Sequence, residues 1–390
     1  MYSNQAEKAA KRKEAEDAQR KAAEANDISK EDYGELPVVS DAAPTGVPRV
    51  KLADIAEKFK DASTIGEEGG PQVVFRAAVN NARNQSAKLS FLMLGQSLDT
   101  IQAVVAESPT LSRQMVKFCG SVPTESVVLV HGVVKKPIEP VKSATVSHLE
   151  IHIKKLYIEC KADIQLPMQV ADAERPLPAE GEEPVEGDAH PIVTLNTRLN
   201  NRVIDLRAKH NRAIFKIKSG ITTLFREYLE AKDFIGVQSA KMLGAASEGG
   251  ANVFEVKYFD KKAFLAQSPQ LAKQMLIAAR MEKVYEVGPV FRAENSNTAR
   301  HLTEFTGLDL EMEIQEHYHE AIEMLEGLML YIFDGLRTKY KRETDLVRSI
   351  YHVEDFKLPE AGKTIRLPFW EGIKMLRDAG VEINDFDDLR

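Results

Sequence analysis

The chain has 390 residues, of which 43% are hydrophobic and 28% charged, a composition ordinary for a soluble globular protein of two or three domains. Its net charge of −7 means that any nucleic-acid contact must come from a local basic patch. There is no apolar run of about 18 residues, and the first residues are charged and rich in acid, so we expect no membrane span, secretory signal or mitochondrial transit peptide. Cys119 and Cys160 are far apart and outside any C-x-x-C pair, which favours a reducing compartment over a zinc site or disulfide framework.

Residues 1–48 are predicted to be a charged extension and a linker. The first thirty residues have Ile28 as their only branched aliphatic residue, and acidic and basic side chains recur four positions apart. Without an apolar stripe this segment cannot pack on a core, so it is predicted to be a solvated or partly disordered helix. Proline, glycine, serine and aspartate then predict a linker up to Pro48.

Residues 49–165 are predicted to form an OB-fold β-barrel, because they hold short alternating strands with one helix between the third and the fourth. The predicted strands are Gln72–Asn80, Lys88–Gly95, Ile101–Val105, Ser126–Val134 and His148–Glu159, and the helix is Ser112–Phe118. This fold binds single-stranded nucleic acid by stacking bases on exposed aromatic rings. Phe91 shares a face with Leu89 and Met93, so the alternation by itself favours a core position for it over an exposed stacking ring.

Residues 166–191 are acidic and rich in proline, which predicts a hinge, and 192–390 are predicted to form a second domain. Its helical patterns are a long helix with apolar residues at Ile214, Ile217, Ile221, Leu224, Phe225 and Tyr228, and a helix over Glu316–Tyr340 with Ile322, Leu325, Leu328, Met329, Ile332 and Phe333 facing inward. Two glycines allow the Ser247–Gly250 loop to move. His317 and His319 are two positions apart and would point apart on a helix, so we expect no metal site there.

The segment Val284–Ile314 predicts two strands joined by the polar loop Asn295–His301. Arg292 and Glu294 are two positions apart and share one face. Phe305, Gly307, Asp309 and Glu311 share one face of the second strand, and Leu308, Leu310 and Met312 share the other. A guanidinium for phosphate, a carboxylate for an exocyclic amine and a ring for a base suit a nucleotide. The alternative is an ion-paired hairpin in some other fold.

The pattern F-R-x-E, a short loop and R-H-x-x-E-F resembles motif 2 of the class II aminoacyl-tRNA synthetases, and FRAENSNT…TEFTGLD resembles their aspartyl branch in its eukaryotic cytoplasmic form. The resemblance covers about Ile28 to the end of the chain. It implies an α+β protein in which an N-terminal OB-fold β-barrel binds the anticodon, followed by a class II antiparallel-sheet catalytic domain. It also implies ATP-dependent activation of L-aspartate to aspartyl-adenylate and transfer to tRNA(Asp) in the cytoplasm.

The resemblance also implies site residues. Arg292 would be the catalytic residue, bridging the substrate carboxylate and the α-phosphate, while Glu294 would accept from the adenine amine and Phe305 would stack on adenine. The implied ATP-binding residues are Arg292, Ala293, Glu294, Arg300, His301, Leu302 and Phe305. The implied aspartate-binding residues are Ser247, Glu248, Gln270, Lys273, Arg292 and Asp309. The implied anticodon-binding residues are Arg83, Phe91 and Gln102, with Phe91 stacking on a base.

Lys273 could supply the buried cation that a substrate carboxylate needs, and the alternative is a surface lysine on a helix. The resemblance includes motif 1, a helix and strand that build a homodimer in the class. Here Ala240 stands where the class has a proline, and Gly236 stands where the aspartyl branch usually has an acidic residue. Proline fixes φ, so this difference bears on the dimer contact and on local geometry rather than on the chemistry.

The 390 residues contain no G-x-G-x-x-x-R string, the motif 3 pattern that holds the ATP phosphates, and in the family the carboxylates for Mg²⁺ lie in that same region. We therefore expect an incomplete catalytic domain, and a fragment that is inactive in adenylate formation by itself. Two alternatives stay open: a non-catalytic RNA-binding or regulatory remnant, and a relaxed enzyme that also charges asparagine tRNA. The N-terminal extension could add RNA affinity as in eukaryotic relatives, although its seven basic and six acidic residues give that role weak electrostatic support.

Overall fold

The computed structural model describes residues 27–37, 46, 48–61, 63, 65, 70–176, 191–247, 253–293, 295–296, 298, 301–360 and 363–387. Of the first thirty residues, predicted to be a helix, 1–26 lie outside this part of the chain, and 28–30 form a turn rather than a helix. The chain divides into two compact units, one of residues 1–173 and 193–205 and one of 174–192 and 206–390. The domain boundaries predicted from the sequence at residues 48, 165 and 191 remain predictions. None of the described helices is long and apolar enough to cross a membrane.

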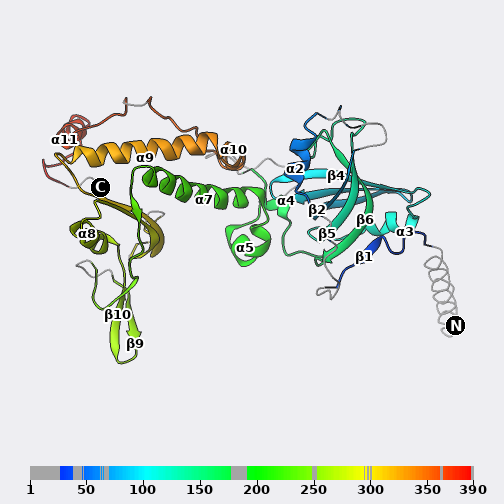
Figure 1. Ribbon diagram of the computed structural model, residues 1–390, viewed down its shortest axis with the longest axis horizontal. Helices are drawn as coiled ribbons and strands as arrows, with labels where there is room; N and C mark the ends of the chain where they lie inside the picture. Colours follow the sequence, from blue (N-terminus) through cyan, green and yellow to red (C-terminus); the bar gives the residue numbers. More distant parts are fainter. Residues whose placement is uncertain are drawn as a thin grey trace. The chain divides into compact units, whose positions relative to one another are not determined.

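The first unit contains a closed five-stranded barrel, coloured blue to cyan-green in Figure 1. Its elements are β1 (Tyr33–Glu35), α2 (Leu52–Lys58), β2 (Gln72–Ser86), β3 (Leu89–Gln96), β4 (Asp99–Ala106), α3 (Arg113–Cys119), β5 (Val127–Lys135), β6 (Glu150–Cys160), α4 (Val170–Ala173), α5 (Leu195–Asn200) and α6 (Arg202–Asp205). The strand order β6-β4-β3-β2-β5 is closed by pairing of β5 with β6, and β1 adds to β6 in parallel. The predicted OB-like barrel is thus confirmed.

Alternation along the strands places the barrel core. Val73, Phe75, Ala77 and Val79 of β2 are all buried, as the period-two pattern predicts for one face of a strand. The helix α3 begins after Ser112, whose hydroxyl accepts a hydrogen bond from the Met115 amide at 3.2 Å and so caps the first turn. The strand predicted at Gln72–Asn80 is β2, and it is longer than predicted because it continues through two register shifts to Ser86.

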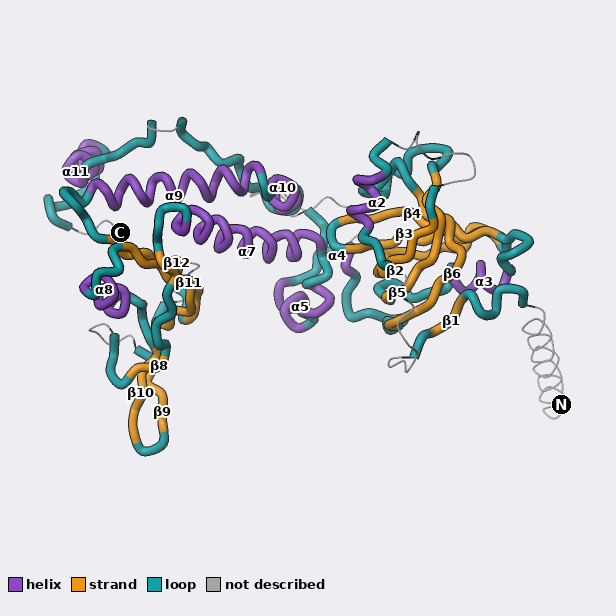
Figure 2. Tube along the Cα trace, viewed as in Figure 1, coloured by secondary structure: helices purple, strands orange, loops and turns teal. Residues whose placement is uncertain are grey.

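The second unit is built from long helices packed against a small sheet (Figures 1 and 2). Its elements are α7 (Lys209–Glu230), β7 (Ile235–Gly236), β8 (Met242–Leu243), β9 (Glu255–Tyr258), β10 (Lys261–Leu265), α8 (Gln270–Ala278), β11 (Lys283–Phe291), β12 (Glu304–Met312), α9 (His319–Thr338), α10 (Lys341–Arg348) and α11 (Phe369–Asp378). One described sheet has the order β12-β11-β7, with β11 and β12 antiparallel and β7 parallel to β11. A second described sheet has the order β8-β10-β9.

The helices α7 and α9 lie side by side and bury one face of the β11–β12 hairpin (Figure 2). They approach closely at Gly335, where an added Cβ would lie 2.6 Å from Leu224 of α7. The predicted α9 helix is confirmed, but its inward face is narrower than predicted. Leu328, Ile332 and Leu336 are buried, whereas Ile322, Leu325 and Met329 are 37–49% exposed. These three residues line an apolar groove of about 830 Å³ that the chain around residues 357–369 forms against α9.

Gly236 of β7 has a local reason to be glycine. A Cβ there would lie 2.9 Å from both Cζ and Oη of Tyr285 on the neighbouring strand. The Tyr285 ring packs edge-on against Phe225 of α7, and its hydroxyl donates a hydrogen bond to Glu230 at 2.6 Å. An acidic side chain at position 236 would therefore have to displace a buried ring. Ala240 lies beyond β7 in the extended segment before β8.

Tyr285→Phe is expected to lower the free energy of unfolding at pH 8 by about 1 kcal/mol, because one buried hydrogen bond is lost. Burial and the Glu230 carboxylate raise the pKa of Tyr285 from 10.0 to about 12. Folding therefore favours the neutral phenol, and this stabilisation is complete below pH 10 and is lost as the pH rises toward 12. Urea unfolding at pH 8 and pH 11 measures both effects. A stability difference between the two proteins that is unchanged at pH 11 would contradict this account of Tyr285.

Candidate functional site

The β11–β12 hairpin presents one polar face, as the alternation predicts. Residues directly opposite each other in an antiparallel pair point to the same side. The pairs on this face are Val290 with Phe305, Gly288 with Gly307, Glu286 with Asp309, and Val284 with Glu311. The other face carries Tyr285, Val287, Leu310 and Met312, which pack on the core formed with α7 and α9. The helices thus anchor the apolar face of the hairpin, and the helix α8 contacts both of its strands.

Arg292 and Phe305 meet at the loop end of the hairpin. The guanidinium carbon of Arg292 lies 5.6 Å from the centroid of the Phe305 ring, within the range of a cation–π contact. Arg292 follows the last residue of β11, and its amide donates to the Thr303 carbonyl at 3.0 Å, which extends the hairpin by one step. Two of the three groups singled out in the sequence are therefore brought together. The third, Glu294, lies outside the described residues.

The remaining predicted ATP contacts lie in or beside the loop. His301 is exposed, and its Nδ1 lies 2.6 Å from the Thr298 hydroxyl. Leu302 is 54% exposed and Ala293 is half-buried. Arg300 lies outside the described residues.

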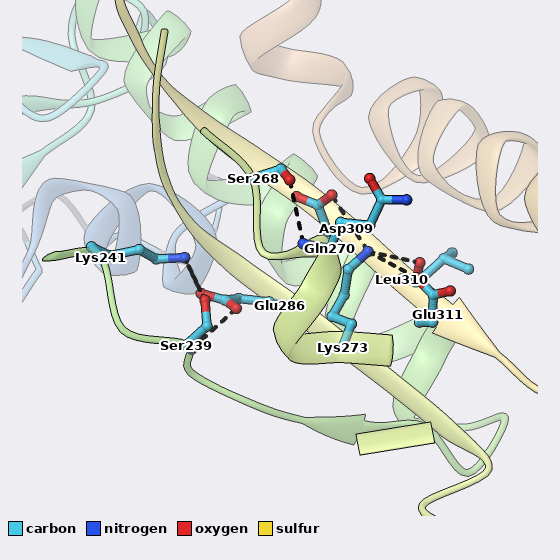
Figure 3. Close-up of polar contacts among 9 residues, drawn as sticks. All are labelled: Ser239, Lys241, Ser268, Gln270, Lys273, Glu286, Asp309, Leu310 and Glu311. Atoms are coloured by element: carbon cyan, nitrogen blue, oxygen red, sulfur yellow. Dashed lines mark hydrogen bonds and ion pairs between the residues drawn. The ribbon is translucent and has the colours of Figure 1, made fainter. Parts of the chain in front are cut away.

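Lys273 of α8 lies on the hairpin rather than in solvent. It is 5% exposed, so the alternative of a surface lysine is wrong. Its Nζ donates to the Leu310 carbonyl at 3.1 Å and lies 3.6 Å from Asp309 and 3.5 Å from Glu311. Figure 3 shows the ammonium pointing at these three groups from the helix. A buried cation between two half-exposed carboxylates is a site of mixed charge, which suits a ligand with both an ammonium and a carboxylate.

The other predicted aspartate contacts flank α8. Gln270 begins the helix and is exposed, with its amide 3.4 Å from the Ser268 hydroxyl. The Ser247 hydroxyl accepts a hydrogen bond from the Gln267 amide at 3.0 Å, which joins Ser247 to the chain entering α8. Glu248 lies outside the described residues.

The pair Gly288–Gly307 also lies on this face, and side chains of neighbouring residues cover both glycines. A Cβ at Gly307 would lie 2.6 Å from Asp309 Oδ2, and one at Gly288 would lie 2.9 Å from Glu286 Oε1. Other side chains also reach these positions, because an added Cβ would lie 2.9 Å from Val290 Cγ2 at Gly307 and 3.3 Å from Lys241 Cε at Gly288. Glycine at both positions therefore lets the neighbouring side chains lie against the sheet, where a larger residue would displace them.

The sequence reasoning missed the contacts of three polar residues at this face: Glu311 as a partner of Lys273, and the ion pair of Lys241 with Glu286. The signal for Glu311 was present, because it alternates with Phe305, Gly307 and Asp309. Nothing in the sequence pairs Lys241 with Glu286, since the two residues are far apart along the chain and belong to different elements.

The barrel carries a second cluster. Arg83 lies within β2, which continues past the predicted strand end at Asn80. It is directly opposite Phe91 of β3, with its guanidinium carbon 5.1 Å from the ring centroid. Ser90, Leu92 and Leu94 fill the core while Phe91 is half-buried on the outer face, so the core interpretation of Phe91 is wrong. Arg83, Phe91 and Gln102 together line a pocket of about 150 Å³. Gln102 also donates to Glu150 at 3.4 Å.

A metal ion has no evident ligands here: among the described residues, no three His, Cys, Asp or Glu side chains lie close enough together to hold one. The Mg²⁺ implied by the resemblance therefore finds no fitting set in this part of the chain. The Arg292–Phe305 pair, by contrast, offers a cation and a ring face that fit a nucleotide.

Comparisons with known proteins identify the family of the chain. Residues 194–386 match the family of class II tRNA synthetases (D, K and N). The cytoplasmic aspartate–tRNA ligase of Homo sapiens is 45% identical over 366 residues, which are 94% of this chain and 70% of that protein. The corresponding protein of Caenorhabditis elegans is 39% identical over 366 residues, 93% of this chain and 66% of that protein.

Solved structures show the same architecture. The aspartyl-tRNA synthetase of Entamoeba histolytica matches with a TM-score of 0.76 and 35% identity, covering 92% of this chain and 69% of that chain. The asparaginyl-tRNA synthetase of Pyrococcus horikoshii in complex with asparaginyl-adenylate matches with a TM-score of 0.68 and 26% identity, covering 88% and 70%. The chain therefore belongs to the class II aminoacyl-tRNA synthetases and, within them, to the family of cytoplasmic aspartate–tRNA ligases, which are enzymes.

Proposed function

We propose that the protein activates L-aspartate with ATP to give aspartyl-adenylate and pyrophosphate, and then transfers aspartate to the terminal ribose of tRNA(Asp). The observation that carries the proposal is the buried Lys273 beside Asp309, on the same hairpin face as the Arg292–Phe305 contact. One end of this face suits a small zwitterion with an extra carboxylate, and the other end suits a nucleotide.

The chemistry needs positioning and charge stabilisation rather than a protein nucleophile. The substrate α-carboxylate attacks the α-phosphorus in line, and pyrophosphate leaves with the electrons of the broken P–O bond. Arg292 bridges the carboxylate and the α-phosphate while Phe305 stacks on adenine. Lys273 binds the side-chain carboxylate of aspartate, and Asp309 holds Lys273 in place. Ser247, Glu248 and Gln270 complete the aspartate contacts, and Glu294, Arg300 and His301 complete those to ATP.

Mg²⁺ would neutralise phosphate charge in such a reaction, but among the described residues no three His, Cys, Asp or Glu side chains are grouped to hold it. The 390-residue polypeptide also contains no motif 3 string. We therefore expect no pyrophosphate exchange from this polypeptide by itself, and exchange from the full-length gene product. Measuring aspartate-dependent ATP–pyrophosphate exchange with both proteins tests this, and rapid exchange by the polypeptide by itself would contradict it.

A second candidate function is that of a non-catalytic RNA-binding or regulatory protein derived from a synthetase. The absent motif 3 string and Ala240 in place of the motif 1 proline favour it. The contact of Arg292 with Phe305 speaks against it, because residues without a catalytic role would have no reason to keep this arrangement. Absence of exchange by the full-length gene product, together with tight tRNA binding, would favour the second candidate. Charging of both aspartate and asparagine tRNA would instead identify the relaxed enzyme.

The partners of the proposed enzyme are tRNA(Asp), aspartate, ATP and a second copy of the chain that pairs through the motif 1 region. The relatives are named as cytoplasmic proteins, which supports the same location here. The anticodon is assigned to the pocket of Arg83, Phe91 and Gln102, because a ring on the outer face of a barrel beside an arginine is an arrangement on which single-stranded bases stack.

Phe91→Ala is expected to weaken binding of tRNA(Asp) by about tenfold to a hundredfold, because one stacked base is lost. ATP–pyrophosphate exchange is expected to stay unchanged, since that reaction needs no tRNA. Filter binding of tRNA(Asp) and an exchange assay, both with variants of the full-length gene product, measure the two effects. The control is Phe118→Ala. Phe118 is a half-buried ring in the same unit whose centroid lies 4.9 Å from that of the Tyr33 ring, and it does not line the pocket. Equal effects of the two variants on tRNA binding would contradict the anticodon assignment.

A further inference from the structure

A second lysine–carboxylate pair lies on the polar face of the hairpin, and the proposed mechanism does not use it. Lys241 Nζ lies 2.5 Å from Glu286 Oε1, and the Glu286 side chain is only 3% exposed. The Ser239 amide donates to Glu286 Oε2 at 3.1 Å, and Lys241 Nζ lies 2.9 Å from the Ser239 hydroxyl. Figure 3 shows this group beside the Lys273 group. The carboxylate of Glu286 thus has a partner on each oxygen.

Glu286 is directly opposite Asp309 in the β11–β12 pair, so two carboxylates share one face at adjacent positions. Like charges directly opposite each other in a sheet are destabilising, and a buried carboxylate without a partner costs more still. Lys241 is the ammonium ion that Glu286 contacts, while Lys273 lies between Asp309 and Glu311. Without Lys241, an incoming substrate carboxylate would meet one further uncompensated negative charge beside Lys273.

The backbone of Lys241 reaches the other parts of the site. Its carbonyl accepts from the Ala266 amide at 2.9 Å, and the Ala266 carbonyl accepts from the Phe291 amide at 3.0 Å. Phe291 immediately precedes Arg292, and the chain after Ala266 leads through Gln267 into α8, which carries Lys273. The residue that neutralises Glu286 is therefore also bound to the segments that present both proposed substrate-binding cations.

We propose that Lys241, through its pair with Glu286, is a positioning residue for aspartate binding. It cancels the charge of Glu286, so that Lys273 presents a net attraction to the substrate side-chain carboxylate, and it fixes the chain that enters α8. This inference rests on the proposed function and adds to it a determinant of selectivity for an acidic amino acid. Lys241 itself contacts no reacting atom.

The test compares variants of the full-length gene product by ATP–pyrophosphate exchange, with aspartate varied at constant ATP and then the reverse. Lys241→Met keeps the length of the side chain and removes its charge. It is expected to raise the KM for aspartate about tenfold or more, with the KM for ATP changed less than about twofold. Lys241→Met combined with Glu286→Gln removes both charges and is expected to return the aspartate KM to within about threefold of the original value.

Lys216→Met is the matched control. Lys216 Nζ of α7 lies 2.5 Å from Glu343 of α10, whose side chain is 4% exposed, so the same kind of pair is broken within the same unit. The control is expected to lower the melting temperature and to leave the aspartate KM unchanged. The inference is overturned if Lys241→Met behaves like the control, or if the double variant stays as impaired as the single one. If the full-length gene product without substitutions shows no exchange with aspartate, the proposed function is wrong, and the inference that rests on it is wrong as well.

Discussion

Arg292→Ala is expected to lower the rate of aspartate-dependent ATP–pyrophosphate exchange by about a thousandfold or more. The guanidinium is the group assigned to both the attacking carboxylate and the α-phosphate, so its removal takes away charge stabilisation that grows in the transition state. Arginines that stabilise a transferring phosphoryl group are worth about a thousandfold to a hundred-thousandfold in rate. The contact of Arg292 with the Phe305 ring already orients the side chain along the hairpin face.

Exchange kinetics and thermal unfolding of the full-length gene product measure this effect together. The expected pattern is a large loss of kcat with a small change in melting temperature, because Arg292 is exposed at the end of β11. Arg337→Ala is the control, since Arg337 on α9 pairs with Asp334 at 2.7 Å and is not part of the proposed site. Exchange near the original rate in Arg292→Ala would contradict its assignment.

Lys273→Met is expected to raise the KM for aspartate about a hundredfold while changing the KM for ATP little. The ammonium is buried and lies between Asp309 and Glu311, so its removal deletes the cation for the substrate and leaves two carboxylates facing the ligand. Breaking a charge-assisted contact and adding repulsion act in the same direction. The change in exchange kinetics is therefore expected almost entirely in the KM for aspartate.

Two comparisons make this second result specific. Lys273→Arg keeps the charge but not the compact ammonium, and is expected to retain part of the aspartate affinity. Lys283→Met is the control, because Lys283 lies on the same hairpin but donates to the Lys232 carbonyl on the opposite face. If Lys273→Met raised the KM values for ATP and aspartate equally, the assignment of Lys273 to the aspartate carboxylate would be wrong.

The fold was largely predictable because its signals are local. Alternation from Val73 to Val79 marks a barrel strand, and apolar residues at helical spacing mark α7, so these elements follow from their own sequence. The face shared by Phe305, Gly307, Asp309 and Glu311 follows from the same period of two. The arrangement of the hairpin around one polar face could thus be derived before any coordinates.

The rest depends on contacts between distant segments. Leu325 and Met329 fit the helical pattern of α9, yet they line the groove against the chain around residues 357–369, and their spacing cannot show which face meets the core. Phe91 is on the outer face because Leu92 and Leu94 fill the barrel, a choice that a fully apolar strand leaves open. The partnership of Lys241 with Glu286 has no local signal at all, because only the tertiary fold brings them together.

The most direct test of the central claim is amino-acid-dependent ATP–pyrophosphate exchange by the full-length gene product, measured side by side with aspartate, asparagine and lysine. The buried Lys273 beside Asp309 and the Arg292–Phe305 contact predict exchange with aspartate that exceeds exchange with the other two by about a hundredfold or more. Exchange that is absent with aspartate, or equally fast with asparagine or lysine, would contradict the account.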